Sequence, residues 1–537
     1  MSLPQNPYNQ PPQATTRPQR TPQEQQTPPM LPIPVSRLRK MSRREWMAKR
    51  LMAGKAIIAD HLPNWFASYA IFTYVVALIG VNIIFSNYAT EWYFWLFGIA
   101  WVAGFFYLSV DFSRKWNLLH VRKSRDFEKK LFWTGFLIRV AYAFFIYFFY
   151  IEMTGQPHEF AAADSIAYIE TAQWLAAGWK GSYMMDVVSN LVTTSLGDAG
   201  FPLYLFLPVL ILEGDVVVLV ICVVNAMFGA YTSVIVYRMA TRLMGENIAR
   251  LAAIFCMWHP VLICYVGMTL KEVFMTWLLV LFIDMADRML VGKKYSLATI
   301  APVVLVGLTL FLFRTVLGMV AFMAVFFALM MMETKLVGWG KKFILSIVLA
   351  GVLLLSVSDN IMREINQIRE TDIREQQENT MVKRYGSEKG GTISGNKFAN
   401  YAGAAVFAPL IFTIPFPTMV NIGFQEDMRL IHGGNWMRNV MSGFVILAMF
   451  MLLLTGDWRK YTLMVAVLLG YLVVLIFSAF AHSLRFHIPV MPLEMIFAAY
   501  AIMNMRKKQK FWYLLWCLFM ILTCFGWNWM KLRGRGL

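Results

Sequence analysis

The segment LFWTGFLIRVAYAFFIYFFYI, residues 131–151, decides the fold class. It is long enough to cross a bilayer, because a transmembrane α-helix needs roughly 20 residues. Many further apolar runs of about 18 or more residues follow along the chain, and 58% of its 537 residues are hydrophobic. These runs are continuous rather than alternating, which favours helices over a transmembrane barrel. We therefore expect an all-α polytopic membrane protein.

The overall charge and the cysteines fit this class. The net charge of +18 at pH 7 is explained by Lys and Arg in cytoplasmic loops, so it does not indicate a nucleic-acid partner. The five cysteines all fall inside apolar runs, which predicts packing residues rather than disulfides or metal ligands. Neither a metal-binding motif nor a phosphate-binding glycine loop stands out. The sequence therefore indicates no metal and no other cofactor.

The positive-inside rule orders the apolar runs into about 13 transmembrane helices with a cytoplasmic N-terminus. Five regions follow from this order. Residues 1–58 form a disordered, Pro/Gln-rich basic tail, and residues 59–130 form a transmembrane hairpin with a basic cytoplasmic loop. Residues 131–358 form a transmembrane core, which includes the first external loop at 152–215. Residues 359–437 form a second external region with surface helices, and residues 438–537 form the C-terminal transmembrane helices.

Two apolar segments are assigned to the external surface. Residues 201–212 are too short to span easily, and counting them as a span would place the arginines that follow outside. Residues 401–420 are broken by three prolines, so we expect a surface or re-entrant helix there. The Gly-rich segment 386–396 is predicted to be a flexible loop. This topology leaves the C-terminal KLRGRGL outside, against the positive-inside rule.

Charged and histidine side chains near the ends of the predicted spans converge on the external face. An ionisable group beside a membrane-embedded segment is costly and indicates a functional site by default. The candidates are Asp164, Glu170, Lys271, Glu272, Arg314, Arg438, His482, Arg485 and His487.

Asp164 is the first of these candidates, in the stretch AAADSIAYIETAQWLAAG at 161–178. A carboxylate in a partly dehydrated site can take the proton from an acceptor hydroxyl. Asp164 is also placed to cap the helix that begins there, and the two roles are compatible. Tyr168 lies one helical turn further on.

Three motifs resemble a known superfamily. Asp-x-x-x-Tyr at 164–168, followed by Gly-Phe-Pro-Leu-Tyr at 200–204, resembles the first external loop of the GT-C superfamily, whose members are multi-spanning glycosyltransferases with lipid-linked sugar donors. The pattern Arg-Phe-x-x-Pro-x-x-Pro at 485–492 resembles the entry to a late span in many of these enzymes. Taken together, residues 131–290 and roughly 461–505 resemble a GT-C transferase of the protein-mannosyltransferase and aminoarabinose-transferase type.

The resemblance implies transfer of a sugar, with inversion, from a polyprenyl-phosphate-linked donor to a glycan, lipid or protein acceptor. Asp164 would act as the base or as an orienting carboxylate, and Glu272 would assist it. Arg485 would bind the phosphate through its planar guanidinium, together with Lys271. The expected compartment is the cytoplasmic (inner) membrane of a bacterium, with the active site on the periplasmic face and membrane lipids around it.

Several of these residues also have a structural interpretation. Lys271 and Glu272 could form a salt-bridged pair in a tight loop. Arg314 is either a second phosphate contact or an anchor at the membrane edge. Histidines such as His482 and His487 are more often hydrogen-bonded surface residues than substrate ligands, although they flank Arg485.

Three departures from the GT-C pattern and three competing functions remain. An additional hairpin (65–110) precedes the span that is normally first, Ser165 stands where many relatives have a second acidic residue, and the region 359–437 matches no known pattern. A non-catalytic membrane scaffold would use the Pro/Gln-rich tail as a ligand, but it would leave the external charges without a purpose. An O-antigen-type polymerase or ligase, acting on diphosphate-linked oligosaccharides, would use Arg429, His432 and Arg438. A transporter or flippase would carry charges at mid-membrane, whereas the predicted span interiors are nearly charge-free.

Overall fold

The computed structural model describes residues 62–534 with internal gaps. The predicted disordered tail (1–58) and the span expected at 343–357 lie outside the described residues. The gaps are 116–123, 195, 213, 293–295, 332–409 apart from two short strands, 423–424, 478–480, 482 and 506–507.

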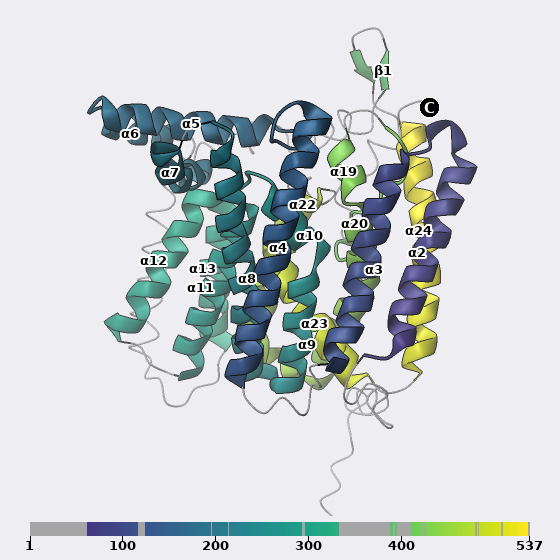
Figure 1. Cartoon of the computed structure of the whole chain (residues 1–537). Helices are drawn as coiled ribbons and strands as arrows, with labels where there is room; N and C mark the ends of the chain where they lie inside the picture. Colours follow the sequence, from purple (N-terminus) through teal and green to yellow (C-terminus); the bar gives the residue numbers. More distant parts are fainter. Residues whose placement is uncertain are drawn as a thin grey trace, which may run out of the picture. The chain divides into compact units, whose positions relative to one another are not determined.

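Apolar α-helices make up most of the described chain, as expected (Figure 1). Among the described residues, eight helical segments are long and apolar enough to cross a membrane. They are α2 (Asn64–Ile84), α3 (Trp92–Lys115), α4 (Ser124–Thr154), α8 (Val216–Met244), α20 (His432–Thr455), η5 with α21 (Asp457–Tyr461 and Thr462–Phe477), α22 with η6 and α23 (Leu484–His487, Ile488–Val490 and Met491–Asn504), and α24 (Gln509–Gly534).

Further helices complete the bundle. A ninth span results if the helix Glu246–Trp258 and the segment Pro260–Gly267 are counted as one broken helix. The remaining elements include a more charged helix and two shorter apolar ones. They are α9 (Glu246–Trp258), α10 (Pro260–Cys264), η3 (Tyr265–Gly267), α11 (Glu272–Gly292), α12 (Leu297–Phe313) and α13 (Thr315–Met331). The all-α polytopic class is thus confirmed, while length and composition alone support eight or nine spans among the described residues.

The span predicted at 251–268 is not one straight helix. Its two parts meet at a bend of 50°, between Trp258 and Pro260. Proline lacks the backbone N–H that would continue the helix, and it forces the preceding residue into an extended conformation. The fully buried Arg139 of α4 donates to the carbonyl oxygens of Met257 (3.1 Å) and Cys256 (3.2 Å) at this break. The expectation of nearly charge-free span interiors is therefore wrong at Arg139.

Three helices follow α4 in the first external loop. They are α5 (Ala163–Lys180), α6 (Met184–Thr194) and α7 (Leu196–Ile211). In Figure 1, α5 and α6 run across one end of the bundle, at the top of the view. The 16 residues of α7 are fewer than the roughly 20 that a span needs, as predicted for 201–212. α7 packs between α5 and α12.

The helix expected at 401–420 is wrong for its described part. Residues 410–422 are irregular and mostly buried. Asn528 of α24 holds this segment, since its Oδ1 accepts the N–H of Met419 (2.8 Å) and its Nδ2 donates to the carbonyl of Pro417 (3.0 Å). Prolines at positions 415 and 417 remove backbone donors that a helix requires.

Three small elements complete the described chain. A hairpin of β1 (Ser387–Lys389) and β2 (Thr392–Ser394) occurs in the segment predicted to be a flexible loop, with Glu388 paired to Ile393. The other two are the turn η2 (Ser86–Tyr88) and the short helix α19 (Glu426–Leu430).

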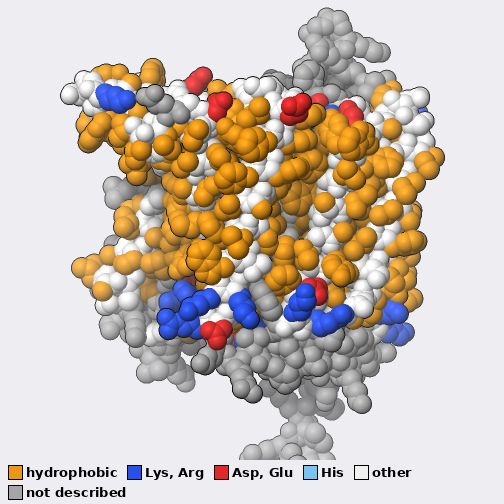
Figure 2. Space-filling view, in the orientation of Figure 1, with side chains coloured by type: hydrophobic (Ala, Val, Ile, Leu, Met, Phe, Trp, Pro, Cys, Tyr) orange, Lys and Arg blue, Asp and Glu red, His pale blue; other side chains and the backbone are white. Residues whose placement is uncertain are grey.

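The surface charges are asymmetric. Figure 2 shows a broad apolar band on this face, with Lys and Arg gathered near its lower edge and Asp and Glu near its upper edge. Arg114 and Lys115 in the last turn of α3, and Arg242 in the last turn of α8, belong to the basic end. The five cysteines are free and buried, as expected for packing residues.

Candidate active site

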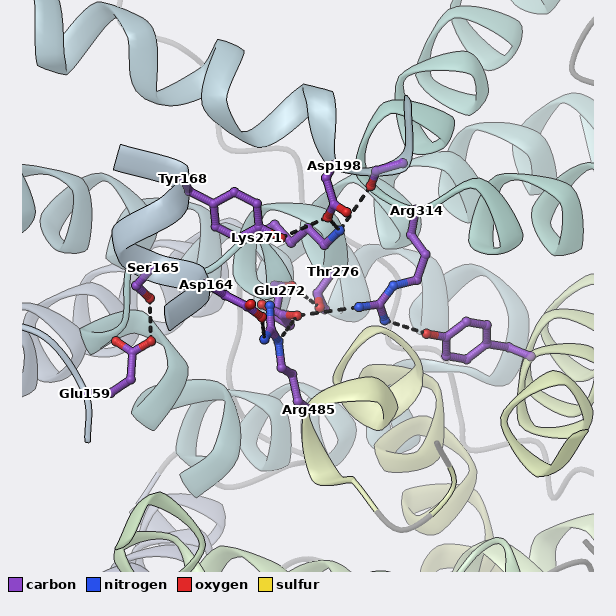
Figure 3. Close-up of polar contacts among 12 residues, drawn as sticks. Glu159, Asp164, Ser165, Tyr168, Asp198, Lys271, Glu272, Thr276, Arg314 and Arg485 are labelled. Atoms are coloured by element: carbon purple, nitrogen blue, oxygen red, sulfur yellow. Dashed lines mark hydrogen bonds and ion pairs between the residues drawn. The ribbon is translucent and has the colours of Figure 1, made fainter. Parts of the chain in front are cut away.

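Three segments that are far apart in the sequence meet near the end of the bundle at which α5 lies. They are the start of α5, which carries Asp164, the start of α11, which carries Glu272, and the short helix α22, which carries Arg485 (Figure 3). The helices α4, α8 and α9 pack together and support this arrangement. Three of the predicted site residues therefore form one cluster.

Arg485 joins the two predicted carboxylates. Its Nε lies 2.5 Å from Oε1 of Glu272, and its Nη1 donates to Oδ2 of Asp164. The Glu272 side chain is fully buried, whereas that of Asp164 is 57% exposed. Asp164 lies in the first turn of α5, and no side chain caps this helix, so the capping role predicted for Asp164 is not observed. Of the three side chains, that of Asp164 is the most exposed to solvent, so a ligand can reach it.

Arg314 adds a second guanidinium to the buried carboxylate. It lies directly after α12, where its Nη2 is 3.6 Å from Oε1 of Glu272 and its Nη1 donates to the Tyr471 hydroxyl at 3.0 Å. The Phe486 ring lies 4.5 Å from the Arg314 guanidinium carbon, close enough for a cation–π contact. Oε2 of Glu272 is buried without a hydrogen-bond partner. Two cations, Arg314 and Arg485, therefore share one buried carboxylate. Their combined positive charge exceeds the negative charge of the carboxylate, so together they can bind a further anion.

Lys271 is paired with a residue that was not predicted. Its ammonium group forms an ion pair with Asp198 and donates to the carbonyl of Gly197 at 3.0 Å. The Tyr168 hydroxyl donates to Oδ1 of the same Asp198 at 2.9 Å. Burial lowers the pKa of Lys271, and the Asp198 carboxylate opposes that shift. The alternative interpretation, a salt bridge between Lys271 and its neighbour Glu272, is not observed, because Lys271 pairs with Asp198 and Glu272 pairs with Arg485.

Two carboxylates hold the loop before α5, the buried Glu159 and the partly buried Asp427. The Ser165 hydroxyl donates to Glu159, and Asp427 of α19 accepts the backbone N–H groups of Phe160 (3.2 Å) and Ala161 (2.9 Å). Burial raises the pKa of Glu159 to about 7 and that of Asp427 to about 6. These contacts tie the first external loop to the C-terminal part of the chain and set the position at which α5 begins.

Other candidates lie apart from the cluster. His487 is fully buried, where its Nδ1 accepts from Arg438 (2.9 Å) and its Nε2 donates to the carbonyl of Ala481 (2.6 Å). Arg438 is also buried and pairs with Glu494 at 2.8 Å. Glu170 is exposed on α5. His482 lies outside the described residues.

Three side chains of the cluster were missed by sequence reasoning. Asp198 lies two positions before the Gly-Phe-Pro-Leu-Tyr motif, so its position beside a quoted motif was a usable signal. Glu159 lies five positions before Asp164 but in a polar loop without a pattern. Tyr471 lies inside an apolar span, and its contact with Arg314 follows only from the packing of α13 against α21.

The cluster is a charge-balanced group of three carboxylates, Asp164, Asp198 and Glu272, and three cations, Lys271, Arg314 and Arg485. Within the part of the chain that the structure describes, no three His, Cys, Asp or Glu side chains gather in a way that could hold a metal ion. Lys271, Arg314 and Arg485 provide positive groups that a phosphate can bind, because guanidinium and ammonium groups form charge-assisted hydrogen bonds with phosphate oxygens. Asp164 provides an exposed proton acceptor next to them.

The C-terminal helices carry a family match. Residues 429–532, which include Arg485, match the Alg9-like mannosyltransferase family. No curated protein and no solved structure matches the chain. The matched family is a GT-C type family of membrane glycosyltransferases that use lipid-linked sugar donors. Over these 104 of its 537 residues the chain is similar to polytopic glycosyltransferases of the GT-C type, and its many apolar helices agree with that class.

Proposed function

We propose that the protein transfers a monosaccharide from a polyprenyl-phosphate-linked donor to an acceptor hydroxyl on the external, periplasmic face of a bacterial inner membrane. The observation that carries this proposal is the bridge made by Arg485 between the buried Glu272 and the exposed Asp164. The bridge brings a phosphate-binding cation and a candidate base to one point. The proposed face follows from the basic residues at the opposite end of the bundle, because basic ends of membrane helices face the cytoplasm.

The proposed reaction is a single displacement. The acceptor oxygen forms a bond with the anomeric carbon while the bond from that carbon to the phosphate oxygen breaks, and the configuration inverts. The acceptor proton passes to Asp164, and the electron pair of the broken bond stays with the polyprenyl phosphate. Arg485, Arg314 and Lys271 stabilise the charge that develops on this leaving group.

Donor binding would also prepare the base. In the described structure, Nη1 of Arg485 is bonded to Asp164, so the carboxylate is held by a cation. A donor phosphate competes for the same guanidinium. When the phosphate takes this contact, Asp164 becomes free to accept a proton, while the buried Glu272 keeps Arg485 in place through Nε. Glu272 therefore acts as a positioning residue.

The positions of three other residues do not favour the polymerase alternative. A polymerase or ligase of the O-antigen type would need Arg429, His432 and Arg438 exposed toward its substrate. Each of the three is buried. Their partners are Glu91 and Glu426 for Arg429, Tyr74 for His432, and Glu494 for Arg438.

The test is sugar transfer in membranes from a radiolabelled polyprenyl-phosphate monosaccharide, with Asp164→Asn compared with wild type at matched expression. Asp186→Asn is the matched control, because Asp186 is also an exposed aspartate in the first turn of an external helix. Loss of transfer in Asp164→Asn alone supports the proposal. Robust transfer by Asp164→Asn removes the base role. Consumption of diphosphate-linked oligosaccharides, with no use of monophosphate donors, overturns the proposed function.

A further inference from the structure

A cavity of about 280 Å³ adjoins the candidate active site. It lies between the loop before α5, η3, the segment 415–418, α19, the start of α20, and the end of α24. We call it the Asn435 cavity. Its polar lining includes Glu159, Asp427, Asn435, Ser483, Arg485 and Lys531.

We propose that the Asn435 cavity binds the acceptor substrate as a neutral sugar ring, an inference that rests on the proposed function. The cavity is connected to the reactive cluster in two ways. Arg485 lines the cavity and also bonds to Asp164. Glu159 lines the cavity and accepts from Ser165, the residue that follows Asp164. A ligand seated here contacts the side chain of Arg485, which itself bonds to the proposed base.

Two polar atoms of the cavity that lack a hydrogen-bond partner favour a ligand with hydroxyl groups. Oδ1 of Asn435 and Oε2 of Glu159 are buried without a hydrogen-bond partner, and both side chains are more than nine-tenths buried. The amide oxygen of Asn435 can only accept a hydrogen bond, and Glu159 in its ionised form does the same. A phosphate at neutral pH has few protons to donate, whereas each sugar hydroxyl donates one. Buried polar atoms without partners are costly, so a polyol that satisfies them gains affinity.

The distribution of charge separates this cavity from the phosphate site. Lys271 and Arg314 do not line it, while the carboxylates Glu159 and Asp427 do. In Figure 3, Glu159 lies on one side of Asp164 and Arg314 on the other. Lys531 lies at the cavity wall, where it donates to Thr418 and Gln425. A donor phosphate is therefore favoured near Arg314, and a neutral ring is favoured in the Asn435 cavity.

Aromatic side chains supply the apolar part of the lining. Phe416 and Trp527 both line the cavity, and their ring centroids lie 5.7 Å apart in an edge-to-face arrangement. Tyr265 of η3 also lines the cavity. Small-molecule sites combine such apolar surfaces with a few well-placed polar groups. The size and lining of the cavity suit one sugar ring.

The first experiment measures equilibrium binding without any donor. Purified protein in lipid nanodiscs is titrated with four radiolabelled probes: methyl α-mannoside, methyl β-glucoside, methyl β-galactoside and methyl N-acetyl-β-glucosaminide. We expect saturable binding of at least one probe and an affinity at least ten times lower for Asn435→Leu. Asn225→Leu is the matched control, because Asn225 is a fully buried asparagine of α8 that does not line the cavity.

A second variant tests whether a loss of binding comes from the cavity itself rather than from misfolding of Asn435→Leu. Ala161 is exposed and lines the cavity, so Ala161→Trp fills the space without changing a buried contact. We expect it to abolish binding as well. The proposal is overturned if none of the four glycosides binds wild type, or if neither Asn435→Leu nor Ala161→Trp weakens the binding. A peptide acceptor would give the first of these results.

A third measurement separates this inference from the proposed function. With a polyprenyl-phosphate monosaccharide and the bound glycoside present, Asn435→Leu is expected to raise the KM for the glycoside at least tenfold and to leave the KM for the donor within twofold of wild type. A raised KM for the donor instead assigns the cavity to the donor and overturns the inference. If wild type binds glycosides but never cleaves the donor, the proposed function fails while the sugar site stands.

Discussion

The Nε atom of Arg485 lies 2.5 Å from Oε1 of Glu272, although the two residues are 213 positions apart in the sequence. This pair fixes one edge of the guanidinium on a carboxylate that solvent does not reach. The other edge then points to the exposed Asp164. The pair thereby orients a cation toward the place where a phosphate and a base meet in the proposed reaction.

Replacement of this arginine tests the orientation rather than the charge. Arg485→Lys keeps one positive charge but cannot contact Glu272 and Asp164 through two edges of a planar group. We expect kcat for sugar transfer to fall by about 10² to 10³-fold, the range for loss of one preorganised donor at a developing negative charge. Initial rates with a radiolabelled polyprenyl-phosphate monosaccharide measure this effect. Arg125→Lys, at an exposed position in the first turn of α4, is the control. An unchanged kcat would contradict the proposed role of Arg485.

Neutralisation of Glu272 is expected to affect stability as well as activity. Glu272→Gln keeps the shape of the side chain but removes the carboxylate that faces Arg485 and Arg314, two largely buried cations. Breaking a buried ion pair costs about 3 kcal/mol or more of unfolding free energy. A lower Tm in detergent, measured by intrinsic fluorescence, checks this expectation. The exposed Glu170→Gln should leave the Tm nearly unchanged, and equal values for both variants would disprove the structural role of Glu272.

The fold class and the core of the site were predictable for physical reasons. Apolar runs long enough to span a bilayer are read directly from composition, since lipid permits only helices or closed barrels. Asp164, Glu272 and Arg485 were predictable because charges at the ends of apolar helices have few purposes other than function. The distance between them was not predictable, because it depends on how α5, α11 and α22 pack.

The errors of the sequence analysis share a cause. Arg438 and His487 were assigned to the external face from their positions near span ends, yet both are buried. Burial depends on a partner elsewhere in the chain, here Glu494 at 2.8 Å from Arg438. The break at Pro260 was visible in the sequence, but the buried Arg139 that satisfies the carbonyl groups around it is known only from the packing of α4.

The buried Glu159 is expected to make stability depend on pH. Its pKa is raised to about 7 from an ordinary value of 4.5, because burial disfavours the charged form. The folded state therefore binds the proton more tightly, so its stability is fully present below about pH 4.5 and is lost as the pH rises through about 7. Asp427, with a pKa of about 6, acts in the same direction at lower pH.

Glu159→Gln isolates this effect, because glutamine is neutral at every pH and can still accept from Ser165. For wild type we expect a loss of about 1 kcal/mol between about pH 6 and pH 8, and a smaller loss for the variant. Tm values measured across this range, at constant ionic strength, provide the comparison. Parallel curves for the two proteins would show that Glu159 does not titrate there.

The pair formed by Arg438 and Glu494 separates a structural role from a catalytic one. Two hydrogen bonds join the side chains, at 2.8 Å and 3.0 Å, and both residues are almost fully buried. Arg438→Met leaves the Glu494 carboxylate uncompensated, so we expect a loss of about 3 to 5 kcal/mol in the free energy of unfolding. The double variant Arg438→Met, Glu494→Leu removes both charges, and replacement of a buried pair by apolar groups is often neutral.

We therefore expect the double variant to regain most of the Tm that Arg438→Met loses. Transfer activity per folded molecule should also match wild type, because Arg438 contacts none of Asp164, Glu272 and Arg485. A substrate contact by Arg438 predicts a different result, namely a stable double variant that remains inactive. Thermal unfolding and initial rates, measured on the same preparations, decide between the two, since only the structural role lets the second substitution restore both quantities.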